Sequence, residues 1–371
     1  MGRRSEKAAG IFSAVLAVAA AVCVFLRVPA NAGRNAAVAA AGFILPGGAA
    51  EEIGGRIFDE EEEDGSAPAP QVSSRIGTSS AVPASSAVPS SSLPPFSGQS
   101  FSSGRVSSAA PASSASAVSI PDNVVETSLA TGGIQYQNIW VKNTNQNHSI
   151  DVAQELAKQP AVKIQKNGEP QVLIYHTHTT EAFLGDTRTT DKSRSVCAVG
   201  DEIAEQLEAA GIGVIHDTTY HDYPAYNGSY DRSVVTMANY LGKYPGIQVT
   251  LDIHRDAMSR SDGTQYKPTA VIDGKKAAQV MIISGCDDTG DLGFPNWEYN
   301  LRLAVRLQKS LSDLYPGLAR PLDFCARRYN ENMTKGSLLI EIGTNANTLD
   351  EAKYSGELLG KALAAVLNDL T

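Results

Sequence analysis

The chain contains few cysteines, and their spacing argues against two kinds of small domain. Only four occur among its 371 residues (Cys23, Cys197, Cys286 and Cys325), and no two of them form the C-x-x-C pattern typical of a zinc finger. Cys23 lies in an apolar N-terminal segment, which leaves three in the rest of the chain, so at least one of those cannot pair. The sequence therefore does not indicate a small domain stabilised by disulfide bonds.

The chain also lacks an excess of basic residues. Its 31 lysines and arginines are outnumbered by 40 aspartates and glutamates, which gives a formal net charge of -9. No basic stripe with interleaved aromatic residues is present. These features argue against nucleic acid as a partner.

One long apolar run without charges extends from Ala8 to Leu26 and follows a basic tip. At about 1.5 Å per residue it approaches the ~30 Å thickness of a bilayer core. The preceding positive charges predict that the rest of the chain lies outside the cytoplasm. We expect residues 1–30 to form a cytoplasmic tip and a single-pass anchor in the cell membrane. A cleaved signal peptide is the alternative, because Ala30-Asn-Ala32 has the pattern of a cleavage site.

Residues 31–119 have too few apolar side chains for a core of their own. An acidic run, Asp59 to Asp64, precedes sequence that is rich in Ser, Pro and Ala and has almost no aromatic residues. Burial in such a segment cannot offset the entropy cost of ordering it. We therefore expect a disordered linker that lets the following domain reach away from a membrane.

From about residue 120, strand-like and helix-like patterns alternate. Short apolar runs predict strands at 135–141, 171–176, 212–215, 248–254, 278–284 and 337–342. Helical periodicity and capping residues predict helices at 149–156, 200–210, 233–243, 300–314 and 349–370. The alternation predicts an α/β domain over residues 120–371, with a mostly parallel sheet flanked by helices.

Potential metal ligands stand where the strand at 171–176 ends. In open α/β sheets the chemistry gathers at this end of the strands. His178 and Glu181 form an H-x-x-E pair whose nitrogen and oxygen donors suit zinc. His176 alternates with His178, so the two should face opposite sides and only one should bind. The spacing to Glu181 favours His178, and Asp191 is an alternative carboxylate ligand.

His254 ends another apolar strand and would complete a His₂Glu zinc site with His178 and Glu181, leaving one position open for water. Glu341 is the only charged residue between Leu338 and Gly343. Because burying a charge is costly unless it is paired or used, Glu341 is a candidate general base that deprotonates zinc-bound water. An ion pair with an arginine is the structural alternative.

Two further features could contribute to substrate binding. Arg255 could polarise a substrate carbonyl or bind a peptide carboxylate. A loop rich in tyrosine could wall a substrate groove; its members are Tyr220, Tyr223, Tyr226 and Tyr230.

Three motifs, Gln171–Phe183, Leu251–Asp256 and Ser337–Thr344, resemble the stage II sporulation protein P family, and the similarity extends over about residues 120–371. The resemblance implies a cell-wall hydrolase of endospore formers that acts during engulfment of the forespore. The family is described as both an N-acetylmuramoyl-L-alanine amidase and a peptide-crosslink endopeptidase. It also implies stage II sporulation proteins D and M as partners.

The domain is also similar to zinc-dependent cell-wall amidases, which implies His178 (or His176), Glu181 and His254 as ligands and Glu341 as the base. In those amidases the early glutamate lies farther from the first histidine, a spacing that Asp191 matches better. The H-x-x-E arrangement instead resembles zinc carboxypeptidases.

We therefore expect a membrane-anchored zinc amidase with peptidoglycan as its substrate. One alternative is a carboxypeptidase-like wall peptidase, in which Arg255 or Arg328 would hold a terminal carboxylate. The other is a wall-binding scaffold without catalytic activity.

Overall fold

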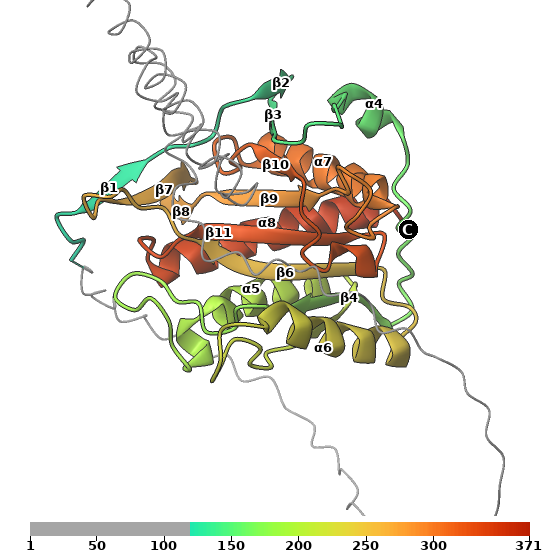
Figure 1. Cartoon of the computed structure of the whole chain (residues 1–371), viewed down its shortest axis with the longest axis horizontal. Coiled ribbons are helices and arrows are strands. Elements are labelled where there is room, and N and C mark those ends of the chain that lie inside the picture. Colours follow the sequence, from blue (N-terminus) through green and yellow to red (C-terminus); the bar gives the residue numbers. More distant parts are fainter. Residues whose placement is uncertain (1–118) are drawn as a thin grey trace, which may run out of the picture. The chain divides into compact units, whose positions relative to one another are not determined.

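The computed structural model describes residues 119–371, so the predicted anchor and linker lie outside the described residues (Figure 1). Among residues 119–371, no helix combines the length and apolarity needed to cross a membrane.

An eight-stranded sheet with the order β2-β3-β10-β9-β11-β6-β4-β5 forms the centre of the fold (Figure 1). Strands β4, β5, β6 and β11 run parallel to one another, as do β3, β9 and β10. The two groups meet at the antiparallel pair β9/β11. The strands are β2 (Ile134–Tyr136), β3 (Ile139–Asn143), β4 (Pro170–Tyr175), β5 (Gly213–His216), β6 (Val249–Asp256), β9 (Val280–Gly285), β10 (Leu322–Cys325) and β11 (Ser337–Thr344).

Helices cover both faces of this sheet. Successive side chains of a strand point to opposite faces, and both faces of the central strands carry apolar side chains that the helices bury. Ile174 and Ile253 belong to the large apolar core beneath α5, α7 and α8, whereas Leu173 and Tyr175 pack with Met237 of α6. A short helix, α4, packs against α7. The helices are α4 (Val152–Ala157), α5 (Val196–Ala209), α6 (Ser229–Lys243), α7 (Trp297–Leu314) and α8 (Leu349–Asn368), with 3₁₀ turns η1 (Lys192–Arg194) and η2 (Glu331–Met333).

A second, three-stranded sheet has the order β1-β7-β8, with β1 at Val124–Thr127, β7 at Gln265–Ile272 and β8 at Lys275–Ala278. Strand β1 pairs with β7 in parallel, and β7 and β8 form a hairpin. The ammonium of Lys267 on β7 lies 2.7 Å from the carboxylate of Glu351 on α8, and the side chains are 1% and 9% exposed. This buried ion pair joins the small sheet to the last helix.

The α/β architecture expected from the sequence is confirmed, with three differences. The strand expected at 135–141 is a hairpin of β2 and β3, because Gln137 takes a left-handed conformation with φ 54° and reverses the chain. The sheet is parallel within each group of strands, but the β9/β11 junction makes it mixed. Strands β1, β7, β8 and β10 were not expected.

The turn after β11 is built around the side chain of Asn347. Its amide oxygen accepts a hydrogen bond from the Thr344 N–H (2.9 Å), and its amide nitrogen donates to the Pro268 carbonyl (3.1 Å). Gly343 has φ +63°, and a Cβ there would lie 2.6 Å from the Asn347 oxygen and 2.8 Å from the Ala278 Cβ. The close approach of Asn347 thus requires glycine at position 343, near the end of the strand that carries Glu341.

Gly343→Ala is expected to lower the free energy of unfolding by about 2–4 kcal/mol, since left-handed strain adds to overpacking. Gly274→Ala is the matched control: φ there is +77°, but nothing lies within 4 Å of the added Cβ. The control should lose only about 1 kcal/mol. Urea unfolding followed by circular dichroism measures both, and equal losses would contradict the role given to the crowded turn.

Candidate metal centre

The carboxyl ends of β4, β6 and β11 meet at one edge of the sheet, because these strands are parallel and adjacent. His178 follows β4, His254 lies on β6, and Glu341 on β11 stands opposite His254 in the strand register. The rings of His178 and His254 lie 5.2 Å apart, centroid to centroid. Three segments that are distant in the sequence therefore form one cluster.

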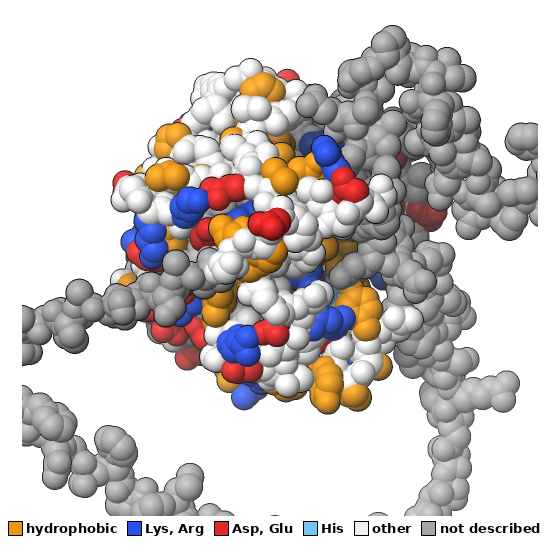
Figure 2. All heavy atoms as spheres, turned by 90° about the vertical axis from the view of Figure 1, so that its left-hand side faces the viewer, with side chains coloured by type: hydrophobic (Ala, Val, Ile, Leu, Met, Phe, Trp, Pro, Cys, Tyr) orange, Lys and Arg blue, Asp and Glu red, His pale blue; other side chains and the backbone are white. Residues whose placement is uncertain are grey.

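The cluster lies towards the side of the molecule where β6 leads into β7. Figure 2 shows this side, where acidic and basic side chains are interspersed among hydrophobic ones. No broad basic surface is visible on the part of this face that the described residues form.

Glu181 and Asp252 flank the ring of His254. The Nδ1 atom lies 3.6 Å from the Glu181 Oε2, and the Nε2 atom lies 2.9 Å from the Asp252 Oδ1. Asp252 is held in turn by Thr177, whose backbone N–H and hydroxyl donate to it at 2.8 and 2.6 Å. This matches the usual surroundings of a ligating histidine, in which a carboxylate orients the nitrogen that does not bind the metal.

The donors fit a zinc ion. The separation of 3.6 Å between the His254 Nδ1 and the Glu181 Oε2 exceeds a normal hydrogen bond. It is close to the ~3.3 Å expected between two ligands that bind a tetrahedral zinc at ~2.0–2.1 Å. His178, Glu181 and His254 are only 6%, 4% and 3% exposed, so their polar atoms face the protein interior.

The charges at the cluster also favour a cation. Burial lowers the pKa of His178 to about 2, so its ring is neutral and keeps a lone pair. Burial opposes a charge on His254 as well, but the carboxylates of Asp252 and Glu181 raise its pKa to about 10. A positive charge at this point compensates the buried carboxylates, and a metal ion would supply it in place of the proton.

Glu341 has an oxygen suited to proton transfer. Its Oε2 is buried and makes no hydrogen bond with any residue between 119 and 371. Burial, followed by repulsion from Asp256, raises its pKa well above the usual value, although His254 and Arg320 oppose the shift. Arg320 donates a hydrogen bond to Asp256 at 2.8 Å, so the charges of these two residues compensate each other.

A second buried glutamate, Glu331 in η2, also has a pKa well above the usual value because of burial. Its Oε2 accepts a hydrogen bond from the Gly285 N–H at 2.8 Å. Glu331 is thus a buried acid outside the histidine cluster, which makes it useful for comparison with Glu341.

The structure places two of the sequence candidates away from the cluster. The Nδ1 of His176 donates to the Ile253 carbonyl at 2.8 Å, and its Nε2 lies 2.8 Å from the Nε2 of His216. Asp191 caps η1 at the surface and accepts from the Ser193 N–H and hydroxyl. The histidines brought together are therefore His178 and His254, and the carboxylate beside them is Glu181.

Arg255 holds the loop that follows β4. Its guanidinium donates to the carbonyls of Ala182 and Thr187 at 3.0 Å each, and its backbone N–H donates to the Glu181 Oε2 at 3.0 Å. The guanidinium also lies 3.6 Å from the Glu181 Oε1. Arg255 thus positions the candidate ligand Glu181.

Aromatic rings pack against His178. Tyr226 stacks on its ring at 4.5 Å, and Tyr230 meets it edge-on at 5.8 Å. The guanidinium of Arg188 lies 4.4 Å above the Tyr226 ring and also pairs with Asp222. The tyrosine-rich loop was expected near the site, but no local sequence pattern marks the Arg188–Asp222 pair.

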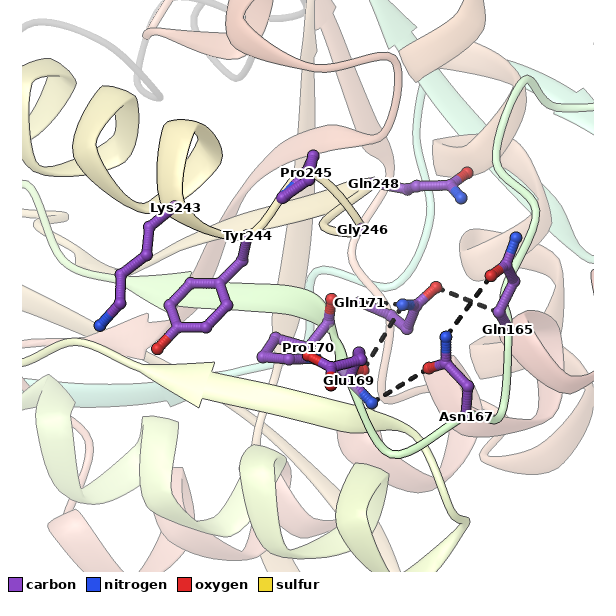
Figure 3. Close-up of a pocket in the computed structure, with 10 residues that line it drawn as sticks. All are labelled: Gln165, Asn167, Glu169, Pro170, Gln171, Lys243, Tyr244, Pro245, Gly246 and Gln248. Atoms are coloured by element: carbon purple, nitrogen blue, oxygen red, sulfur yellow. Dashed lines mark hydrogen bonds between the residues drawn. The ribbon is translucent and has the colours of Figure 1, made fainter.

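A pocket of about 340 Å³ lies elsewhere, at the amino ends of β4 and β6 (Figure 3). Its polar side chains largely bind one another: Gln171 accepts from the Gln165 N–H, and Asn167 donates to the Gln165 side chain. None of the candidate ligands lines it. We therefore do not place the reaction there.

Comparisons with known proteins agree on one family. The family described as Stage II sporulation protein P matches residues 113–364. Stage II sporulation protein P of Bacillus subtilis (strain 168) is 32% identical over 209 residues, which cover 50% of this chain and 49% of that protein. The chain thus matches about half the length of this curated relative.

Two solved structures are also similar. One is the CwlD amidase from Clostridioides difficile in complex with the GerS lipoprotein (14% identity, TM-score 0.36, covering 54% of this chain and 98% of that one). The other is the N-acetylmuramoyl-L-alanine amidase AmiC2 of Nostoc punctiforme (14% identity, TM-score 0.34, covering 54% of this chain and 97% of that one).

His254→Ala is expected to lower the zinc content of the purified chain by one equivalent, because the proposed ligand is removed. His221→Gln is the control, since His221 is a buried histidine that hydrogen-bonds the His176 carbonyl and Thr236 instead. Mass-spectrometric metal analysis after gel filtration measures the content. Equal zinc in both variants would contradict the assignment.

Asp252→Asn should leave zinc bound but weaken its affinity about 10–100-fold, because the orienting carboxylate is lost. Asp217→Asn is a matched control, as Asp217 is also buried but bonds Thr219 and Tyr240. Competition with a chelator measures the affinity. Unchanged affinity in Asp252→Asn would show that the contact with His254 does not serve the metal.

Proposed function

The chain belongs to the stage II sporulation protein P family, and from this we propose that it is a zinc-dependent peptidoglycan hydrolase that acts in sporulation. The bond cut is the amide between N-acetylmuramic acid and the L-alanine of the stem peptide. The observation that carries the proposal is the convergence of His178, Glu181 and His254 beside the unpaired buried oxygen of Glu341.

His178, Glu181 and His254 would hold the zinc. When bound, zinc supplies Lewis acidity, which polarises the scissile carbonyl and makes water more acidic. Asp252 keeps the His254 ring in place, and Arg255 keeps the Glu181 loop in place, so the ligands are ordered before any ion binds. Such preorganisation reduces the cost of assembling the site.

Glu341 moves the proton. It takes a proton from the attacking water as the water oxygen bonds to the carbonyl carbon, and it passes that proton to the amide nitrogen as the C–N bond breaks. Burial raises the pKa of Glu341, so the protonated form between these steps is stabilised. A carboxyl group with an ordinary pKa would lose that proton to solvent more readily.

The arginines favour an amidase over a carboxypeptidase-like reaction. A carboxypeptidase would need an arginine directed at the terminal carboxylate of its substrate. Arg255 instead binds the carbonyls of Ala182 and Thr187, and Arg328 donates to the Leu292 carbonyl at 2.9 Å.

The setting of the reaction is proposed from the family and from the N-terminal sequence. We propose that the catalytic domain works outside the cytoplasmic membrane, tethered by residues 1–30, during engulfment of the forespore. Cleavage of peptide crosslinks would be an additional activity of the same centre. Stage II sporulation proteins D and M are the proposed partners.

Glu341→Gln is expected to reduce the digestion of purified peptidoglycan by about 10²–10⁴-fold, because the amide cannot accept a proton. Glu331→Gln is the matched control: it also replaces a buried glutamate with a raised pKa, but the Oε2 of Glu331 accepts a hydrogen bond from the Gly285 N–H. Zinc content should stay unchanged in both variants.

Mass spectrometry of the released products identifies the bond cut. Intact stem peptides free of sugar support the amidase assignment, whereas products cut only at crosslinks would replace it with an endopeptidase. Wild-type digestion by Glu341→Gln would exclude Glu341 as the base. Peptidoglycan binding without digestion by the wild-type chain would favour the scaffold.

A further inference from the structure

Two loops meet at the sheet edge opposite the candidate metal centre. One follows β3 (residues 144–148) and the other follows β9 (residues 286–288). Since β3, β10 and β9 are adjacent and parallel, both loops lie at the carboxyl end of β10 (Figure 1). Because β9 runs antiparallel to β11, this edge is not the one that carries His254 and Glu341.

These two loops bring together three different metal-binding side chains. Donor atoms of His148, Cys286 and Asp288 all lie within 4.8 Å of one another. Cys286 is fully buried and Asp288 is 9% exposed, while His148 is partly exposed. The partly exposed side gives an ion a route into the cluster.

Each donor is held by the opposite loop or by main-chain groups. Asp288 accepts the N–H groups of Gln146 and Asn147 at 3.0 and 2.9 Å. The thiol of Cys286 donates to the Asn145 Oδ1 at 3.0 Å. The cluster is thus built from ordered contacts between the two loops.

His148 has the orientation expected of a ligand. Its Nε2 lies 3.3 Å from the Asp287 carbonyl, which can only accept, so Nε2 carries the proton and Nδ1 keeps a lone pair. The ring also packs on Trp297 with centroids 4.7 Å apart. A histidine whose second nitrogen donates to a carbonyl is typical of metal sites.

We propose that His148, Cys286 and Asp288 form a second zinc site. The ion would be coordinated by both loops and would link the loop after β3 to the loop after β9. Thiolate, imidazole and carboxylate together are a donor set that zinc accepts and that magnesium and calcium do not favour. The donors must approach to the ~3.3–3.8 Å separation of ligands on one zinc, a small movement for two loops.

Binding at this site exchanges a proton for the ion. The Cys286 S–H bond breaks, its proton leaves to solvent, and the sulfur binds zinc with the electron pair that it retains. The Asn145 oxygen loses its hydrogen-bond donor in the same step. The proposal concerns the structure of these loops and does not depend on the amidase reaction.

The zinc content of the full-length chain tests the proposal. The wild type should hold two equivalents, and Cys286→Ser and His148→Ala should each hold one. Cys325→Ser is the matched control: it makes the same exchange at another buried cysteine, outside the cluster, and should keep two. His254→Ala combined with Cys286→Ser should hold none.

Replacing zinc by cobalt identifies the site by its spectrum. Only this site contains sulfur, so wild type, His254→Ala and Cys325→Ser should all show sulfur-to-cobalt charge transfer in the near ultraviolet. Cys286→Ser should lose that band. This readout uses the wild-type chain, so it stands even if a variant fails to fold.

Three results would overturn the proposal. These are a wild-type chain without the charge-transfer band, a band that persists in Cys286→Ser, and a zinc content that falls only with His254→Ala. If His254→Ala keeps both equivalents while Cys286→Ser loses one, the second site stands and the proposed catalytic centre fails instead.

Discussion

The pairing of β6 with β11 on one side and β4 on the other is the constraint on which the candidate centre depends. In this register Glu341 lies opposite His254. Asp252 lies opposite both Leu339 and Tyr175, and Tyr175 directly precedes the turn from His176 that carries the candidate ligands. A slip of one residue would turn every side chain of the strand to the other face. Such a slip is unfavourable because it would place Thr250, Asp252 and His254 in the apolar core that holds Val249, Leu251 and Ile253.

The candidate centre also concentrates negative charge in a buried place. Glu181 and Asp252 lie against the ring of His254, Glu341 stands near it, and the guanidinium of Arg255 lies beside Glu181. Buried carboxylates are costly unless cations or hydrogen bonds compensate them. The arrangement is therefore better explained as a binding site for a cation than as a device for stability.

The sequence was sufficient to predict the strands that follow simple patterns and to bring the candidate ligands to one edge of the sheet. Apolar runs ending in polar residues located β4, β6 and β11, and the parallel-strand rule brought His178, Glu181, His254 and Glu341 to one edge. The spacing to Glu181 favoured His178 over His176. The sequence could not show what His176 does instead, because that depends on a tertiary contact, its hydrogen bond to the Ile253 carbonyl.

Other strands and the second cluster of metal-binding side chains were not predicted from the sequence, for different reasons. Strand β7 mixes Lys267 and Pro268 with apolar residues, so its pattern is not that of a buried strand. Asp273-Gly274, with φ 50° and 77°, is a strong hairpin signal that could have revealed β7 and β8. The direction of β9 has no local signal, and so the cluster of His148, Cys286 and Asp288 could not be foreseen either.

The pairing of β1 with β7 has a mechanical consequence. The chain enters the described domain through β1, before it reaches any strand of the main sheet. A pull on the preceding segment therefore loads the β1–β7 hydrogen bonds first, and through β7 it reaches the ion pair of Lys267 with Glu351. The small sheet and its ion pair to the last helix would therefore bear such a load before the strands that carry His254 and Glu341.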